Sequence, residues 1–221
     1  MNKLQKVQNT SLRIATGCTK DTNINHLHQE TKILLVKDHL QLHGSILRQK
    51  AQLESHPLHN LTTQYPKSRQ IRETIFQNKD FTRNHDLERT NRTNEKIKEN
   101  CTRIHTEITE DCIKKYPINK VINQPSPPIN EAELSLPRET RRTLAQLRTG
   151  KSPILFTYKH KIDPITYPSP LCPLCKTQPH DVNHLFNCIY VRTTETPITL
   201  WNNPIYMASL LKRWGNRGGL A

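Results

Sequence analysis

The sequence contains little of the material from which a large hydrophobic core is built. Apolar residues make up 33% of the 221 residues and aromatic residues only 5%, whereas globular domains usually contain roughly 45–50% apolar residues, glycine included. The six glycines do not close this gap. Such a composition favours small helical units joined by exposed connections over one large domain.

Long hydrophobic runs are absent as well. No stretch of about 18 apolar residues, the length of a membrane-spanning helix, occurs in the chain, and no strongly amphipathic basic helix indicates attachment to a membrane surface. The N-terminus lacks the apolar segment of a secretory signal. We therefore expect an intracellular protein, nuclear or cytoplasmic, that has no membrane partner.

Acidic residues are few relative to basic ones. The chain has 33 lysines and arginines against 19 aspartates and glutamates, which gives a formal net charge of +14. This excess indicates a polyanionic partner such as RNA or DNA, because basic side chains gain affinity by releasing counterions from phosphates. A basic protein without a specific partner is equally consistent with charge alone.

Apolar side chains recur at three- and four-residue steps, which predicts a mainly α fold. Leu4, Val7 and Ile14 form one such stripe, and Gly17 is placed to end that helix in a left-handed conformation. Cys101 and Cys112 lie on a similar stripe, where their expected role is apolar packing. We expect helices at residues 3–16, 23–30, 36–53, 94–116, 137–147, 153–162 and 204–214.

Half of the six cysteines lie within residues 172–188. Cys172 and Cys175 are separated by two residues, the spacing of a tight knuckle, while His184 and Cys188 lie one helical turn apart. Three thiolates and one imidazole complete a tetrahedral site without an open position for water or substrate. The sequence therefore predicts one structural zinc ion bound by these four residues, in preference to disulfides or unligated thiols.

The neighbours of this motif have expected roles too. His180 is a competing ligand, but its distance from Cys188 breaks the one-turn geometry, so we expect it beside the ligands or exposed. Leu185 and Phe186 are expected to form a small core behind the metal.

The predicted helix pair between Pro137 and Lys161 is the most basic local region, with Glu139 as its only acid. A solvated helix face and a phosphate-contacting face explain such a run equally well. The candidate nucleic-acid-binding residues are Arg138, Arg141, Arg142, Arg148, Lys151, Lys159 and Lys161.

Changes in composition divide the chain into consecutive regions. The predicted architecture is small helical units joined by loops and a Pro-rich linker, ending in a small zinc knuckle. A short helix around Ile71–Phe76 is expected within the polar loop. The regions are a helical region (1–60), a polar loop with an amphipathic helix (61–116), a Pro-rich linker (117–136), a basic helix pair (137–163), a zinc module (164–191) and a tail with a short helix (192–221).

Three stretches of sequence carry a family resemblance. They are residues 4–17 with 24–30, residues 143–150 (Thr-Leu-Ala-Gln-Leu-Arg-Thr-Gly) with Tyr158 and Ile162, and residues 172–188 with Leu200 and Trp201. The first resembles the region just after the palm in reverse transcriptases of non-LTR retrotransposons, particularly the jockey-like group. The second resembles the helical stretch before the C-terminal cysteine–histidine motif of those proteins, and the third resembles that motif and the tail after it.

The resemblance implies that residues 1–60 are thumb-like and that the parent protein joins an endonuclease to an RNA-directed DNA polymerase. Polymerase chemistry needs carboxylates that hold two metal ions, and the family supplies them in a Tyr/Phe-x-Asp-Asp turn. No two aspartates are adjacent in this sequence, and no endonuclease set is recognisable. We therefore expect a non-catalytic C-terminal part without a small-molecule substrate, and we expect His26, His28 and Glu30 to form an exposed helix face rather than a catalytic set.

Two functions follow from these residues. The first is binding of RNA or DNA through the basic helices and the zinc module, with Phe186 or Tyr190 stacking on bases. The alternative is a zinc-stabilised protein-interaction module that docks through a stripe in the tail. That stripe consists of Met207, Leu210, Leu211 and Trp214.

Overall fold

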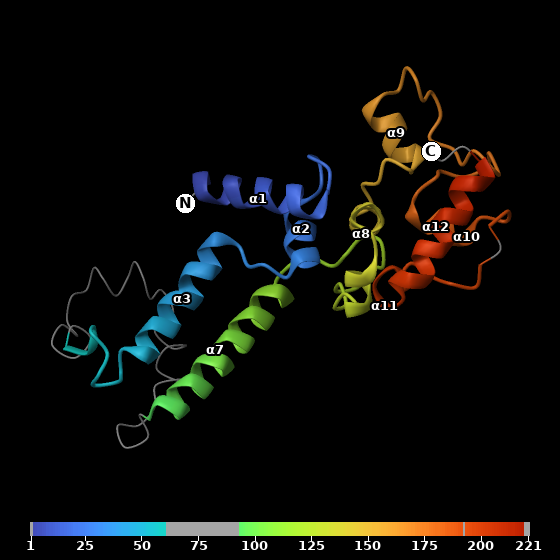
Figure 1. Cartoon of the computed structure of the whole chain (residues 1–221). Coiled ribbons are helices and arrows are strands. Elements are labelled where there is room, and N and C mark those ends of the chain that lie inside the picture. Colours follow the sequence, from blue (N-terminus) through green and yellow to red (C-terminus); the bar gives the residue numbers. More distant parts are fainter. Residues whose placement is uncertain (1, 61–92, 192, 219–221) are drawn as a thin grey trace. The chain divides into compact units, whose positions relative to one another are not determined.

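The computed structural model describes residues 2–60, 93–191 and 193–218, with side chains as far as residue 213 (Figure 1). Helices dominate these residues, and within them only two isolated β-bridges accompany the helices, which confirms the mainly α prediction. None of the helices in the described ranges is long and apolar enough to cross a membrane. The short helix expected around Ile71–Phe76 lies outside the described residues.

The chain forms two compact units. One comprises residues 1–5 and 34–115, and the other comprises residues 6–33 and 116–221. The second unit is therefore discontinuous in sequence, and the boundary falls within α1 (Asn2–Thr16). These units cut across the consecutive regions expected from composition, because composition does not show which distant segments pack together.

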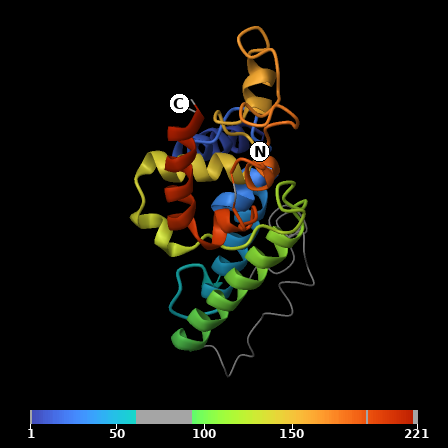
Figure 2. The ribbon, with the colours of Figure 1, turned by 90° about the vertical axis from the view of Figure 1, so that its right-hand side faces the viewer.

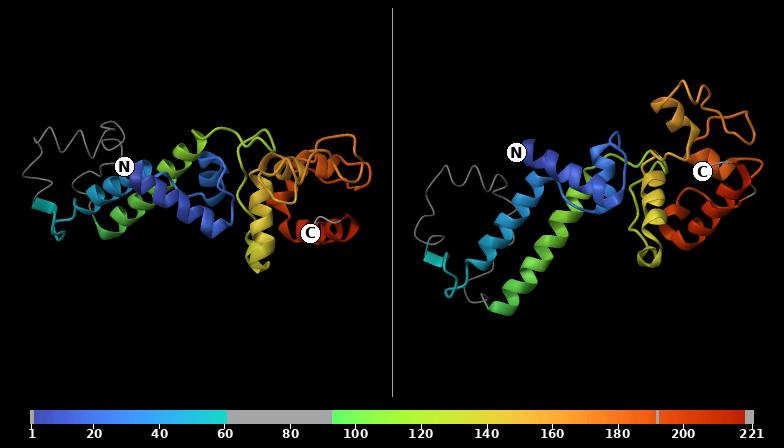
Figure 3. Two further views of the ribbon diagram at one scale, coloured as in Figure 1. Left: turned by 90° about the horizontal axis from the view of Figure 1, so that it is seen from above. Right: turned by 45° about the horizontal axis from the view of Figure 1, so that its top comes forward.

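The first unit is an antiparallel pair of helices, α3 (Val36–Lys50) and α7 (Asn94–Lys114), which lie side by side in both views of Figure 3. Thr93 caps α7 by accepting a hydrogen bond from the Lys96 N–H. The stepped apolar face of α7 packs on α3 as its period predicts, and Cys101 is buried in this face. The small core of the pair consists of Leu34, Leu42, Ile104 and Ile108.

In the second unit, Gly17 follows the last residue of α1, and its φ of 70° confirms the predicted left-handed cap. The stripe that predicts this helix is not its buried face, because Leu4, Val7 and Ile14 are 60–68% exposed. Periodicity therefore locates α1 correctly but does not identify the side that is covered.

Helix α2 (Ile24–Thr31) follows and corrects a second expectation. His26, His28 and Glu30 are all buried instead of forming an exposed face. His28 Nε2 lies 2.9 Å from Asn9 Oδ1, and its Nδ1 lies 2.6 Å from the Ile33 carbonyl. The three side chains therefore lie in the interior of the second unit.

The segment expected as a Pro-rich linker is packed into the second unit. Asn119 is buried and donates a hydrogen bond to the Arg148 carbonyl at 3.0 Å, and Val121 belongs to the apolar core. The segment ends in a 3₁₀ helix, η2 (Glu131–Ser135), which buries Glu133. Its prolines mark irregular backbone, but irregular backbone is not the same as an exposed connection.

The C-terminal helices surround the main core of the second unit. They are α8 (Arg138–Arg148), α9 (Phe156–Ile162), α10 (Val182–Asn187), α11 (Thr199–Asn202) and α12 (Pro204–Gly218). Asn203 caps α12, since its Oδ1 accepts the Tyr206 N–H at 3.1 Å. Figure 2 shows α12 crossing α8, and Trp201 is fully buried among these helices.

Candidate metal centre and basic cleft

The four predicted ligands converge at one point. The ligand atoms of Cys172, Cys175, His184 and Cys188 all lie within 4.8 Å of one another. The sulfurs of Cys172 and Cys188 are 3.9 Å apart, and Cys175 Sγ lies 3.2 Å from His184 Nε2. A tetrahedral ion at usual bond lengths sets these edges at about 3.8 Å and about 3.6 Å. The residues present therefore fit one metal ion with small adjustments.

A short hairpin positions the first two cysteines. An isolated bridge joins Leu171 to Pro179, and the Cys172 N–H donates to the Gln178 carbonyl at 2.8 Å. Within this hairpin, Lys176 adopts a φ of 57° and its N–H donates to the Cys172 carbonyl at 2.8 Å. The turn holds both sulfurs on one side.

Helix α10 supplies the other two ligands. Asp181 caps it by accepting the His184 N–H at 2.8 Å, and Cys188 follows its last residue. Leu185 and Phe186 are buried in the main core, which confirms their predicted packing role. Phe186 is only 4% exposed and cannot stack on a base, whereas Tyr190 is 57% exposed.

The thiols of this cluster differ in acidity. The Thr177 hydroxyl donates to Cys175 Sγ at 3.2 Å and, with backbone N–H groups, lowers the pKa of Cys175 to about 6. Burial raises the pKa of Cys188 to about 11, and the neighbouring Cys172 adds to the rise. Because a divalent cation binds thiolates, ion binding here releases protons, above all from Cys188.

His180 lies beside the ligands and not among them. It is buried, its Nδ1 accepts the Phe156 N–H at 3.1 Å, and its ring centroid is 6.5 Å from that of His184. Burial, and to a lesser degree the charge of His184, lower the pKa of His180 to about 4. His180 therefore connects the start of α9 to the candidate metal centre.

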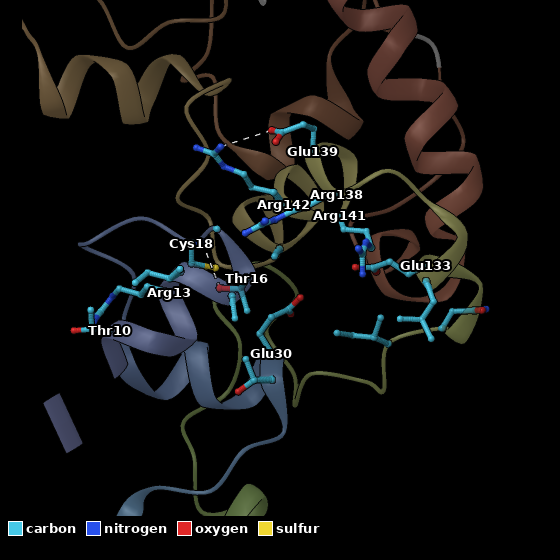
Figure 4. Close-up of a pocket in the computed structure, with 18 of the residues that line it drawn as sticks. Thr10, Arg13, Thr16, Cys18, Glu30, Glu133, Arg138, Glu139, Arg141 and Arg142 are labelled. Carbon is cyan, nitrogen blue, oxygen red and sulfur yellow. Dashed lines mark hydrogen bonds and ion pairs between the residues drawn. The ribbon is translucent and has the colours of Figure 1, made fainter. Parts of the chain in front are cut away.

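A second candidate site in the same unit is a cleft of about 1110 Å³ between the end of α1 and α8. Figure 4 shows three arginines of α8 beside this cleft. Arg138 and Arg141 form no ion pair with any residue that the structure describes, and Arg141 Nε is buried without a hydrogen-bond partner there. Arg142 lies 3.6 Å from Glu139, with both side chains exposed. Arg13 and Lys20 add two further cations to the lining.

Arg148 corrects the predicted set of nucleic-acid-binding residues. Its side chain is 0% exposed, because η2 and α11 cover the last turn of α8. The guanidinium donates to Glu30 at 2.7 Å, to Glu133, and to the Leu200 carbonyl at 2.6 and 2.9 Å. Burial raises the pKa of Glu30, and the charge of Arg148 opposes that rise. Arg148 is a structural residue that joins four segments of the second unit.

The three predicted lysines lie outside the cleft lining. Lys151 and Lys161 lie 3.8 and 3.6 Å from the Asp21 carboxylate, which offsets part of their charge. The Lys159 ammonium lies 5.1 Å from the ring centroids of Phe156 and Tyr167. The structure thus separates the basic region into an arginine cleft and a neighbouring lysine group.

Comparison with known proteins assigns no family to this geometry. No protein family, curated protein or solved structure matches the chain. The resemblance to non-LTR reverse transcriptases therefore rests on the quoted segments of the sequence.

Proposed function

We propose that this chain is a non-catalytic nucleic-acid-binding unit corresponding to the C-terminal part of a non-LTR retrotransposon reverse transcriptase. The observation that supports it most is the cleft beside α8, where Arg138 and Arg141 have no carboxylate partner among the described residues. A planar guanidinium without a partner is well suited to a phosphate, which it binds through two parallel hydrogen bonds.

The charge of the cleft favours a polyanion. Its lining contains five cationic side chains and four carboxylates. Two of those carboxylates, Glu30 and Glu133, are already engaged by Arg148. The free positive charge therefore lies along α8, where successive phosphates of a single strand can be bound.

A triple variant tests this role directly. We expect R138A/R141A/R142A to weaken binding of single-stranded RNA by at least about tenfold at low salt, and to reduce the slope of log K against log salt by about 2, since each lost phosphate contact contributes about 0.7. Fluorescence anisotropy at several salt concentrations measures both quantities.

The matched control removes equal charge elsewhere. The variant K98A/K114A/K115A changes three exposed lysines, one within α7 and two at its C-terminal end. We expect it to retain most of the RNA affinity. An equal loss in the two variants would show attraction by net charge alone and would reject the cleft as the binding site.

The ion that the cluster of three cysteines and one histidine would hold is, in this proposal, zinc. Three thiolates and one imidazole form a closed tetrahedral set, so the ion orders the chain and offers no position for substrate. We expect one zinc per chain by elemental analysis and its loss in C188S. The control C112S changes a half-buried cysteine of α7 and should keep the full zinc content.

The alternative, a protein-interaction module, has less support from the tail. Met207 and Leu210 are 0% and 4% exposed, because they pack in the main core and do not present a docking stripe. The Trp214 side chain lies outside the described residues. RNA binding no stronger than that of a control protein of equal charge would favour this alternative.

A further inference from the structure

Two histidines share one exposed face of α3 in the first unit. His39 and His43 are four residues apart, so they are neighbours on the helix surface. Their Nε2 atoms lie 2.9 Å apart, and their ring centroids are separated by 4.3 Å. Burial, the charge of His43 and the charge of His105 on α7 all lower the pKa of His39. The pair is therefore a close arrangement of imidazoles with a third histidine nearby.

The short nitrogen–nitrogen distance has a chemical consequence. Two neutral imidazoles can approach this closely only if one Nε2–H donates to the lone pair of the other. When the donating ring shifts its proton from Nε2 to Nδ1, both Nε2 lone pairs become free and one metal ion can accept them in place of the hydrogen bond. His39 and His43 are exposed on the helix surface, so an ion from solvent can reach both nitrogens.

The distance also indicates the class of ion. With metal–nitrogen bonds of about 2.0–2.1 Å, two nitrogens at adjacent positions of a square or octahedral ion lie about 2.9 Å apart, and at tetrahedral positions about 3.3 Å. The observed 2.9 Å matches the first geometry directly, whereas the second requires a small separation of the two rings. Ni²⁺ and Cu²⁺ prefer that geometry with nitrogen donors and lie at the strong end of the affinity order of divalent ions.

We propose that His39 and His43 form a second metal site, a bidentate imidazole chelate for an ion of the Ni²⁺ and Cu²⁺ class. Water completes its coordination. The nitrogen donors of this pair distinguish it from the sulfur-rich cluster at Cys172, which is suited to a softer tetrahedral site. The two sites belong to different units of the chain, so this inference is independent of nucleic-acid binding.

Calorimetry with Ni²⁺ tests the proposal on the full chain supplied with one equivalent of zinc. Ni²⁺ is the probe because it does not oxidise thiols as Cu²⁺ does. We expect one Ni²⁺ to bind per chain while elemental analysis shows the zinc content unchanged. H39A and H43A should each weaken Ni²⁺ binding on the order of a hundredfold, because the second ligand of a chelate acts at high effective concentration.

A register variant provides the matched control. L40H/H43A keeps two histidines on α3 but places them on adjacent residues, which face different directions, and Leu40 is already 51% exposed. It should bind Ni²⁺ as weakly as H43A, with circular dichroism confirming an unchanged helix content. Unchanged affinity in H39A, full affinity in L40H/H43A, or exchange of Ni²⁺ for zinc without additional binding would each overturn the proposal.

Discussion

The two units of this protein are stabilised by different means. The first is a pair of long helices that meet along a small apolar seam, with a buried hydrogen bond of 3.0 Å from Asn100 to Gln49. The second has mostly shorter helices and combines a larger core with the Arg148 ion cluster and the candidate metal centre. We therefore expect the second unit to depend on these polar links, and on an ion at the candidate metal centre, in addition to packing.

The distribution of tryptophan allows each unit to be followed separately. Both tryptophans of the chain, Trp201 and Trp214, belong to the second unit. Trp201 is fully buried, so its fluorescence reports unfolding of that unit. Amide hydrogen exchange of the residues in α3 and α7 reports unfolding of the first unit.

Removal of the zinc ion proposed at the Cys172 cluster should produce the largest difference between the units. We expect a strong chelator to destabilise the second unit severely, because structural zinc contributes on the order of 10 kcal/mol at such sites. Tryptophan emission should shift to the red while exchange protection in α3 and α7 persists. An equal loss of hydrogen-exchange protection in the two units would show that they do not unfold separately.

Substitution of Arg148 should have the next largest effect. R148A leaves Glu30 and Glu133 buried without their cation, at a cost of about 3–5 kcal/mol. Urea titration followed by tryptophan fluorescence measures the change. R142A, which removes an exposed arginine from the same helix, should change stability by less than about 0.5 kcal/mol.

A cavity created in the first unit should destabilise that unit and leave the second unit unchanged. Ile104 is 1% exposed in the seam between α3 and α7, so I104A should cost that unit about 3 kcal/mol. Exchange protection in α3 and α7 should fall while the tryptophan transition is retained. A matching decrease in the tryptophan transition would show that the units unfold together.

Two glycines should give small effects of opposite sign. Gly17 has a φ of 70°, and an added Cβ would lie 2.4 Å from Arg142 Cγ, so G17A should destabilise the second unit by about 1–2 kcal/mol. Gly44 lies within α3 and does not have positive φ, so G44A should stabilise the first unit by about 0.5–1 kcal/mol. Denaturant titrations with the two probes test both signs.

The smallest expected effect concerns pH. Burial lowers the pKa of His26 below its ordinary value of 6.5. Below pH 6.5 the unfolded chain binds a proton at His26 more strongly than the folded chain does. The free energy of unfolding of the second unit therefore decreases as the pH falls. The stability of wild type relative to H26N should therefore decline as the pH falls below about 6.5. A pH-independent difference would exclude this contribution.

Local patterns predicted the helices and the ligand cluster well. The limits of α1, α2 and α7 lie within a few residues of those expected, because caps and apolar steps are properties of neighbouring residues. The cluster was predictable for the same reason, since a knuckle and a one-turn pair fix their own geometry.

Local patterns did not predict which side chains are buried by residues that are distant in the sequence. Arg148 lies seven residues after Arg141 in the same basic run, yet its carboxylate partners are 118 and 15 residues distant in sequence. A run of charge therefore gives no sign of which member is covered. The close approach of His39 and His43 had a visible signal, the i, i+4 spacing of two histidines on a predicted helix, which was overlooked.

The discontinuity of the second unit has a consequence for the length of chain that can be inserted into it. Residues 34–115 belong to the first unit, and the second unit resumes at Tyr116. Two hydrogen bonds join the segments on either side of this insertion. Gln29 donates to the Pro117 carbonyl at 2.7 Å, and Lys32 donates to the Ser126 carbonyl at 3.1 Å. The entropic cost of closing such a loop rises by only about 0.6 kcal/mol for each doubling of its length. A change in the length of the chain between α3 and α7 should therefore cost the second unit little stability.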